Sequence, residues 1–256
     1  MQGRRRFALK TLWLPPRSEQ QEWLDAEDIP APDLHENLQD LCWLNRYLGS
    51  HRVVWTAVQR LWCAAGAPQQ WSILDVGTGA ADIPDVLRRW GQQHAIRGLL
   101  VALDNHRGVL AYRQGLGETD TSVAFVQGDG LRLPFRPRTF DVVVCSTMLH
   151  HLEWHEGITL LREMATLARH GVVVNDLLRG RLHYYAARLL LPLVTRNRLT
   201  RHDGPLSVLR AYSVDEVRSM ARLAGLEQAH VQTTLGYRLL LVARLSGAQQ
   251  EVPDGT

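Results

Sequence analysis

Short apolar runs alternate with stretches of helical spacing over residues 71–176. The runs lie at 72–76, 99–103, 123–126, 140–145 and 172–174. Between them, apolar residues at helical spacing predict helices near 82–93, 106–115 and 155–168. Continuous apolar strands separated by helices are typical of a parallel sheet that is covered on both faces. The pattern therefore predicts an α/β fold.

Different patterns flank this region. Leucines at helical spacing predict a helix over 34–48, and a second helical pattern runs through Val54 to Trp62. After residue 176 we expect a helix over 184–194 and then a polar, basic loop over 195–205. Ser213 and Glu216 form a capping box for a helix that ends at Gly225. Two last strands, 228–234 and 237–244, are expected to pair as a hairpin around Gly236.

These patterns give a domain hypothesis. Residues 1–68 form an N-terminal arm and helical cap, and residues 69–256 form the core. Residues 177–210 are an insertion at the edge of the sheet where ligands bind, and a long excursion there is often a lid or a substrate wall.

Composition adds a few limits. The chain has 256 residues, a net charge of +3 and 45% hydrophobic residues, which suits one large domain with additions. Its arginines are spread along the chain, so composition does not demand a nucleic-acid partner. Cys42, Cys63 and Cys145 show no metal or disulfide spacing, which favours a cytoplasmic protein. No apolar run approaches the ~18 residues of a membrane span.

The N-terminus resembles part of a twin-arginine export signal at Arg4-Arg5-Arg6. Such a signal needs an apolar segment of roughly 7–15 residues after the charges. Here Pro15 and Pro16 end the apolar stretch early. A basic arm is therefore the preferred interpretation.

The first apolar run ends in a glycine loop that predicts a nucleotide-type ligand. Gly77-Thr78-Gly79 follows the run, and a helix begins near Asp82. A strand, a tight glycine loop and a helix bring backbone N–H groups close to a ligand. Asp75 and Asp82 would repel a pyrophosphate, and Asp82 replaces the third glycine of the dinucleotide fingerprint. A cationic ligand without phosphate, S-adenosylmethionine (SAM), fits better than NAD.

Two later positions support this interpretation. Asp104 ends the second strand, where an acid accepts hydrogen bonds from ribose hydroxyls, and Asn105 is its weaker neighbour. Asp129, between Gly128 and Gly130, follows the third strand and could accept from an adenine amino group, with the backbone N–H of Gly130 beside it.

Taken together, the motifs resemble those of class I SAM-dependent methyltransferases, in the small-molecule branch that includes ubiquinone and menaquinone biosynthesis enzymes. The matching segments are Leu74 to Asp82, Asp104, Gly128-Asp129 with Leu133-Pro134-Phe135, Phe140 to Val143 and Leu149 to Leu152. The segments Asn45 to Gly49 and Thr200 to Ser207 are similar to methyltransferases of polyketide synthase clusters, which suggests secondary metabolism. The resemblance implies a Rossmann-like, seven-stranded, mainly parallel sheet with SAM across the carboxyl ends of strands 1–4. Cys145, near the end of the fourth strand, is added to the cofactor-binding set.

Catalytic candidates are histidines at the ligand edge. Methyl transfer requires a nucleophile held in line with the methyl carbon, and a phenol also needs a base. His151 and His150 follow the fourth strand, and His202 lies in the insertion. Imidazole is suited to proton transfer near neutral pH. Arg46 is a candidate for the SAM carboxylate.

We therefore expect a SAM-dependent methyltransferase of a small phenolic or polyketide-like metabolite, with O-methylation favoured. C-methylation of a similar ring or enol is the alternative, followed by RNA or protein methylation and by a non-catalytic SAM-binding protein. No metal is expected, because the fourth strand leads into Cys145-Ser146-Thr147, which offers no carboxylate, and Asn175-Asp176 after the fifth strand supplies one at most. A homodimer is an open option.

Overall fold

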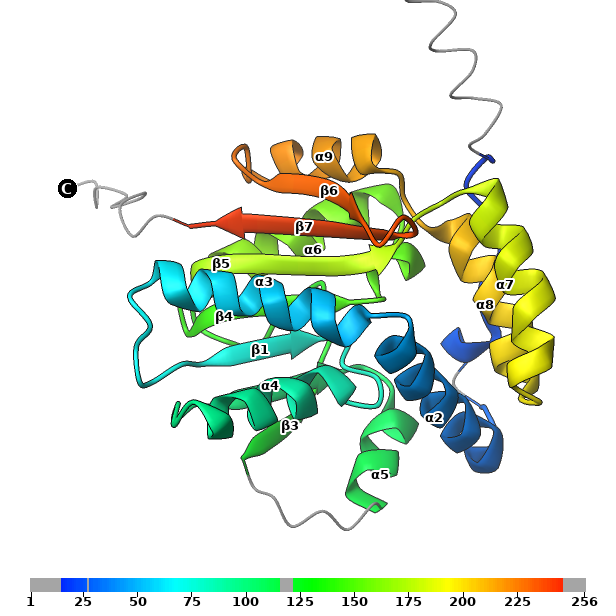
Figure 1. Ribbon diagram of the computed structural model, residues 1–256, viewed down its shortest axis with the longest axis horizontal. Coiled ribbons are helices and arrows are strands. Elements are labelled where there is room, and N and C mark those ends of the chain that lie inside the picture. The colour runs from blue at the N-terminus through cyan, green and yellow to red at the C-terminus, as the bar shows by residue number, and fades with distance from the viewer. Residues whose placement is uncertain (1–14, 27, 116–121, 246–256) are drawn as a thin grey trace, which may run out of the picture.

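A seven-stranded sheet forms the centre of the molecule in the computed structural model, which describes residues 15–26, 28–115 and 122–245 (Figure 1). The strand order is β3-β2-β1-β4-β5-β7-β6. All neighbouring pairs among the first five of these strands are parallel, whereas β7 is antiparallel to both β5 and β6. The predicted Rossmann-like, mainly parallel sheet is confirmed.

The strands lie where the apolar runs predicted them. Their bounds are β1 Ile73–Val76, β2 Leu100–Asp104, β3 Val123–Gln127, β4 Phe140–Ser146, β5 Ala168–Leu177, β6 His230–Thr234 and β7 Arg238–Arg244. The central strand β1 is buried along its whole length, as both faces of the sheet are covered. The expected hairpin is present, and Leu235 and Gly236 turn the chain with positive φ angles of 54° and 82°.

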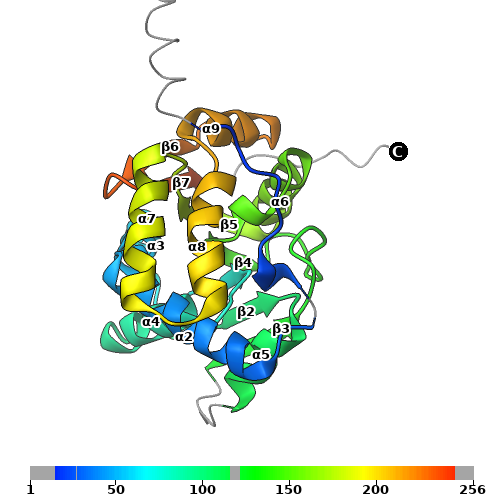
Figure 2. The same cartoon turned by 90° about the vertical axis from the view of Figure 1, so that its right-hand side faces the viewer.

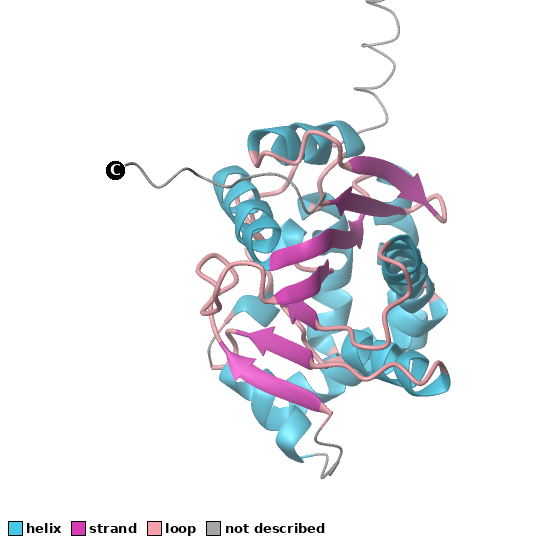
Figure 3. Cartoon of the chain, turned by 90° about the vertical axis from the view of Figure 1, so that its left-hand side faces the viewer, coloured by secondary structure: helices cyan, strands magenta, loops and turns pink. Residues whose placement is uncertain are grey.

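Helices cover both faces of the sheet (Figures 1 and 3). On one face, α3 (Ser50–Ala64) and α4 (Asp82–Gln93) share an apolar core with the central strands. On the other face, α6 (Trp154–Leu167) and α9 (Val214–Leu223) form the larger core. The capping box of Ser213 and Glu216 starts α9 as expected, and Gly225 follows its end with φ +82°.

The N-terminal segment crosses the carboxyl edge of the sheet, where β1, β2, β4 and β5 end (Figure 2). It includes the short helix η1 (Trp23–Asp25) and continues into α2 (Ala31–Tyr47). Helix α2 packs on α5 (Arg107–Gly115) and on the glycine loop, through Leu34, Leu38, Ala80, Val109 and Tyr112. We call residues 15–26 the arm. The predicted basic motif at Arg4 to Arg6 lies outside the described residues.

The insertion after β5 corrects one prediction. Residues 195–205 were expected to form a polar loop, but α8 (Arg198–Arg210) runs through them and packs beside α7 (Arg181–Val194). The Asn197 side chain caps α8 by accepting a hydrogen bond from the Thr200 backbone N–H at 3.1 Å. The helical signal was hidden because the buried positions of α8 include polar residues such as Thr200, Asp203 and Arg210. Those groups are buried against polar partners rather than apolar ones.

In the described part of the chain, every helix is too short or too polar to cross a lipid bilayer.

Candidate cofactor and active site

The glycine loop after β1 is held against β2 by its own backbone. The N–H groups of Gly77 and Thr78 both donate to the carbonyl oxygen of Leu103, at 2.9 and 3.0 Å. Gly77 and Gly79 have φ angles of +68° and +52°, a region that glycine adopts without a steric penalty. A Cβ atom at Gly77 would come within 2.5 Å of the Met148 sulfur. The residue types of the loop are thus dictated by close packing at this edge.

Asp104 ties the loop to the end of β2. Its Oδ2 atom accepts from the Gly79 N–H at 2.9 Å, and its Oδ1 atom accepts from the His106 N–H at 2.9 Å. Each carboxylate oxygen has a second lone pair, which leaves Asp104 able to accept from a ligand hydroxyl. The side chains of Asn105 and Asp129 are exposed, and Asp129 Oδ1 accepts from the Leu131 N–H at 2.8 Å.

Asp75 lies buried beneath this loop. Its Oδ2 atom accepts from the Thr78 hydroxyl at 2.7 Å, and its buried Oδ1 atom makes no hydrogen bond within the described residues. Burial raises the pKa of Asp75 to about 8, with smaller contributions from Asp82 and Asp104. The Oδ1 atom of this buried acid can accept a hydrogen bond from a ligand group.

The arrangement fits the cofactor that the sequence predicts. A Cβ atom on Gly79 would meet no atom of the described residues within 4 Å, so this backbone faces open space. The carboxyl groups of Asp75 and Asp104 both contact this loop. The structure brings together Asp75, Gly77, Thr78, Gly79 and Asp104, as predicted.

Four other predicted cofactor residues lie in different surroundings. Asp82 Oδ2 bonds Asn45 Nδ2 at 3.1 Å and His51 Nε2 at 2.5 Å, so it joins the first turn of α4 to the two helices of the cap. Arg46 and Asp82 line a cavity of about 630 Å³ between α2, α3, α4 and α5. Cys145 is fully buried in the core. Gly130 is buried too, where a Cβ atom would come within 2.9 Å of Met148.

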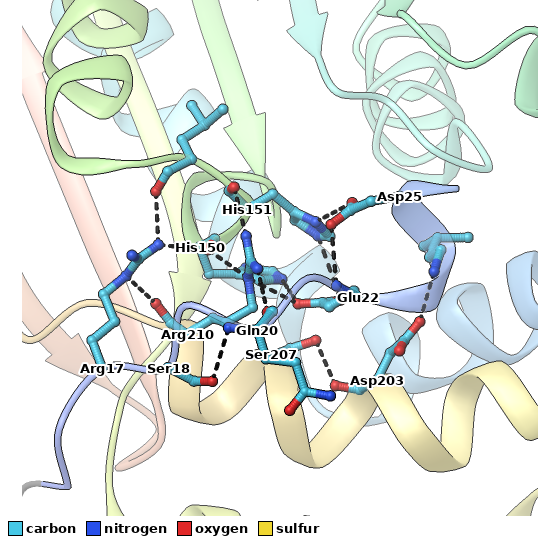
Figure 4. Close-up of polar contacts among 12 residues, drawn as sticks. Arg17, Ser18, Gln20, Glu22, Asp25, His150, His151, Asp203, Ser207 and Arg210 are labelled. Carbon is cyan, nitrogen blue, oxygen red and sulfur yellow. Dashed lines mark hydrogen bonds and ion pairs between the residues drawn. The ribbon is translucent and has the colours of Figure 1, made fainter. Parts of the chain in front are cut away.

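His150 and His151 form the short helix η2 (Leu149–His151) at the end of β4 (Figure 4). His150 Nδ1 lies 2.6 Å from Asp176 Oδ1, and the His150 backbone N–H donates to Asp176 Oδ2 at 3.1 Å. His151 Nδ1 lies 2.7 Å from Asp25 Oδ1. Each imidazole is therefore oriented by one carboxylate, which leaves its Nε2 atom to act on something else.

Both Nε2 atoms face Glu22 of the arm. Glu22 Oε1 lies 3.7 Å from His150 Nε2, and Glu22 Oε2 lies 3.8 Å from His151 Nε2. Glu22 is 5% exposed, and its Oε1 atom makes no hydrogen bond in the described part of the chain. The arm thus places an under-bonded carboxylate directly opposite the two histidines.

Arg210 at the end of α8 holds the arm and η2 together. Its guanidinium donates to the carbonyl oxygens of Gln20, His150 and His151, and its Nε atom lies 3.7 Å from Glu22 Oε1. Arg17 adds bonds to the carbonyl oxygens of His150 and Leu152, at 3.1 and 2.7 Å. Side chains from segments far apart in the sequence therefore join the arm, η2 and α8 at this edge of the sheet.

His202 takes part in anchoring the arm. Its ring stacks on Trp23 with centroids 3.7 Å apart, and its Nδ1 atom lies 2.7 Å from Asp203 Oδ1. The Asp203 carboxylate accepts from the backbone N–H groups of Trp23 and Leu24, both at 2.9 Å. Through these contacts His202 and Asp203 of α8 hold η1 in place.

Neighbouring charged groups affect the protonation of this cluster. Burial alone would lower the pKa of His151, but Glu22 and Asp25 outweigh it and raise that pKa to about 9. Burial of Asp176 likewise opposes ionisation, yet its contact with His150 holds the pKa below its usual range. His151 is therefore protonated at neutral pH in this conformation.

The same cluster has the composition of a cation site. One ligand atom from each of Glu22, His150 and His151 lies within 4.8 Å of the other two. Imidazole and carboxylate groups together bind several divalent metals. The expectation of a metal-free site considered only the residues that follow β4 and β5, whereas Glu22 comes from the arm.

Comparison with known proteins adds to this geometry. Residues 73–171 match a family model described as a methyltransferase domain. Over this span the chain is similar to methyltransferase domains. The matched span runs from the first residue of β1 into β5, so it contains the glycine loop and His150.

One curated relative is similar over part of its length. The demethylmenaquinone methyltransferase of Roseiflexus sp. (strain RS-1) is 31% identical over 142 residues, which are 52% of this chain. The match covers 56% of that relative, so the chain spans only about half of its length.

Solved structures share the fold of the methyltransferase domain. Human N-acetylserotonin methyltransferase, in complex with SAM, matches with a TM-score of 0.55 and 15% identity, over 88% of this chain and 62% of that one. Magnesium protoporphyrin IX methyltransferase from Synechocystis PCC 6803, with bound SAM, matches with a TM-score of 0.52 and 15% identity, over 86% and 100%. At this identity the likeness concerns the fold.

Sequence reasoning missed several residues around the methyltransferase domain. Glu22 and Asp25 lie in a segment with no periodic pattern, and Arg210 ends a helix that was not predicted. Asp176 had a usable signal, because it follows the apolar part of β5 at the edge where ligands bind. Met148 had none, since its role depends on contact with Gly77 and Gly130.

Proposed function

We propose that this protein is a methyltransferase that uses SAM to methylate a small hydroxylated metabolite of phenolic or polyketide-like type, on oxygen. The observation that carries the proposal is the buried Asp176–His150 pair at the same sheet edge as the glycine loop. The names of the curated relative and of the SAM-bound structural neighbours support the cofactor and the small-molecule class.

The cofactor side uses the residues gathered around the loop. Asp104 accepts from the ribose hydroxyls, Asp129 from the adenine amino group, and the loop backbone of Gly77 to Gly79 packs against the ligand. When bound, SAM supplies an electrophilic methyl group on a sulfonium. The protein then has to position the acceptor and manage its proton.

His150 is the proposed base. Its Nδ1–H donates to Asp176, which leaves Nε2 free to accept the proton of the acceptor hydroxyl. As the hydroxyl oxygen forms its bond to the methyl carbon, its proton passes to Nε2, and Asp176 stabilises the resulting imidazolium. His151 is less suited to this step, because its raised pKa keeps it protonated at neutral pH.

The arm has a part in this scheme. Glu22 now faces His150 Nε2, in the direction from which an acceptor hydroxyl would approach. We infer that the acceptor takes the place of this contact, so residues 15–26 shift when it binds.

A first experiment establishes the class of acceptor. Purified protein is incubated with SAM carrying a ¹³C methyl group and a host-cell extract, which is then separated into metabolites, RNA and protein. Label in the metabolite fraction supports the proposal, and ¹³C NMR distinguishes a methoxy from a C-methyl carbon. Label confined to RNA or protein would overturn the acceptor class.

A second experiment tests the base. His150→Gln should lower kcat about 10²- to 10⁴-fold, the range for general-base catalysis, with SAM affinity unchanged within about twofold. His155→Gln is the matched control, because His155 is an exposed histidine on the adjacent α6. Equal turnover in the two variants would place the base elsewhere.

A further inference from the structure

Helix α7 lies on the outside of the molecule (Figure 2) and exposes several large apolar side chains. Leu182, Leu189 and Leu193 are 74%, 68% and 80% exposed, and their spacing of seven and four residues places them on one side of the helix. Tyr185, Leu190 and Val194 are also more than half exposed. We call these six residues the α7 face. Isolated exposed leucines are ordinary, but a contiguous apolar surface of this kind marks an interaction site.

The opposite side of α7 is fully used by the fold. Leu191 is buried against α8, where Gly204 makes room for it, since a Cβ atom at Gly204 would come within 2.2 Å of Leu191 Cδ1. Arg201 of α8 donates to the carbonyl oxygens of Pro192 and Thr195. The helix is thus fixed in place with its leucines pointing outward.

The surface continues onto the N-terminal cap. Val194 and Trp43 line one hollow of about 260 Å³ between α7 and α2. Trp43 and Tyr47 are 47% and 65% exposed, and their rings lie 4.9 Å apart. Tyrosine and tryptophan at the border of an apolar surface are typical of the interface between lipid tails and water.

The chain segment that contains α7 carries charge of one sign. Residues 177–202 contain six arginines and no aspartate or glutamate. Arg181, Arg188 and Arg196 are exposed, and on the helix Arg181 and Arg188 both lie along one side of the leucine row. A helix with an apolar row bordered by basic side chains is the pattern of segments that lie in the surface of an anionic membrane.

We propose that the α7 face docks this protein on the surface of an anionic lipid bilayer. At about 1.5 Å per residue, the 14-residue helix reaches roughly 21 Å and lies along the surface rather than spanning the bilayer. A second copy of the chain fits less well, because a two-fold symmetric contact would bring the arginines of both copies together. The proposal is independent of the proposed methyl transfer.

Vesicle flotation tests the proposal without any enzyme assay. The purified chain is mixed with vesicles of 30% phosphatidylglycerol in phosphatidylcholine, or of phosphatidylcholine alone, at low and high salt. We expect binding to the anionic vesicles that falls at least tenfold in pure phosphatidylcholine and weakens with salt. Absence of binding to the anionic vesicles would overturn the proposal.

Matched variants locate the surface. Leu189→Glu with Leu193→Glu should reduce vesicle binding at least tenfold. The control pair, Leu99→Glu with Leu223→Glu, adds the same charge at exposed leucines outside α7 and should bind like the wild type. Equal losses in both pairs would mean a general charge effect and overturn the assignment. The assignment would also be overturned if light scattering showed that the wild type is a dimer and that only the α7 pair of substitutions converts it to monomers.

Discussion

The two sides of the site are built in different ways. The cofactor side consists of a short loop whose own backbone and neighbouring carboxylates, Asp75 and Asp104, hold it in shape. The acceptor side is a network of charged side chains from the arm, η2, β5 and α8. A backbone site can be recognised from one contiguous motif, whereas a side-chain network exists only after the chain has folded.

The largest expected effect tests the backbone side. Gly79→Arg should abolish measurable SAM binding, a loss of more than about 100-fold, because the side chain would fill the open space in front of the loop. Gly66→Arg is the matched control, since Gly66 also has a positive φ angle and open space but lies at the end of α3. Isothermal titration calorimetry measures both. Similar affinities would disprove the cofactor assignment.

The next effect concerns the stability of the side-chain network. Arg210→Met should lower the free energy of unfolding by about 3 kcal/mol. The substitution removes the positive charge beside the buried Glu22 and the side-chain donor to the carbonyl oxygens of Gln20 and His151. Arg218→Met is the control, as the exposed Arg218–Asp215 pair should contribute less than about 1 kcal/mol. Urea unfolding gives both values. A small change at Arg210 would mean that the arm is not held by this network.

A smaller effect returns to the cofactor side. Asp104→Ala should weaken SAM binding by about 1–3 kcal/mol, the cost of losing hydrogen bonds to a charged group. Asp141→Ala serves as the comparison. The Asp141 carboxylate also accepts hydrogen bonds, from Ser72, but it lies near the start of β4, at the edge of the sheet opposite the glycine loop. If both substitutions weakened SAM binding equally, the effect of Asp104 would be structural.

The smallest effect is a pH dependence of the network. The pKa of His151 is raised to about 9, and the groups facing it are Glu22, Asp25, Asp176 and Arg210. A raised pKa contributes stability below about pH 6.5, the unfolded value, and this stability is lost as the pH rises through 9. Allowing for partial solvent exposure, we expect His151 to contribute about 1–2 kcal/mol.

This pH dependence is measured by urea unfolding at pH 6.5 and 9.5. The stability advantage of the wild type over His151→Gln should shrink between the two values. His155→Gln should show the same pH dependence as the wild type, because His155 is exposed and outside the network. A constant advantage at both pH values would contradict the proposed charge state of His151.

The sequence predicted most of the fold because the fold relies on periodic apolar burial. The bounds of α4 agree with the predicted 82–93, and the capping box of α9 is in place. α8 was missed because its inward side carries Thr200, Asp203 and Arg210, which bind polar partners. Periodicity detects apolar contacts, and it has no signal for a helix that is buried through hydrogen bonds.

The site divides along the same line. Gly77 and Gly79 were predictable because their backbone conformation, with positive φ angles, favours glycine. The pairing of His150 with Asp176 depends on β4 and β5 lying side by side in the sheet, which topology alone could have suggested. Glu22 was beyond reach, because no local pattern shows where an arm without regular structure will cross the molecule.

The path of the arm has a consequence for how the chain folds. Ser18 bonds Leu209, and Arg17 bonds the carbonyl oxygen of Arg210, across separations of up to 193 residues. During synthesis the arm leaves the ribosome well before its partners on α8. The chain between the arm and α8 must lose conformational entropy before these contacts can form and offset that cost. The glycine loop and its strands are complete earlier, so we expect the acceptor side to assemble last.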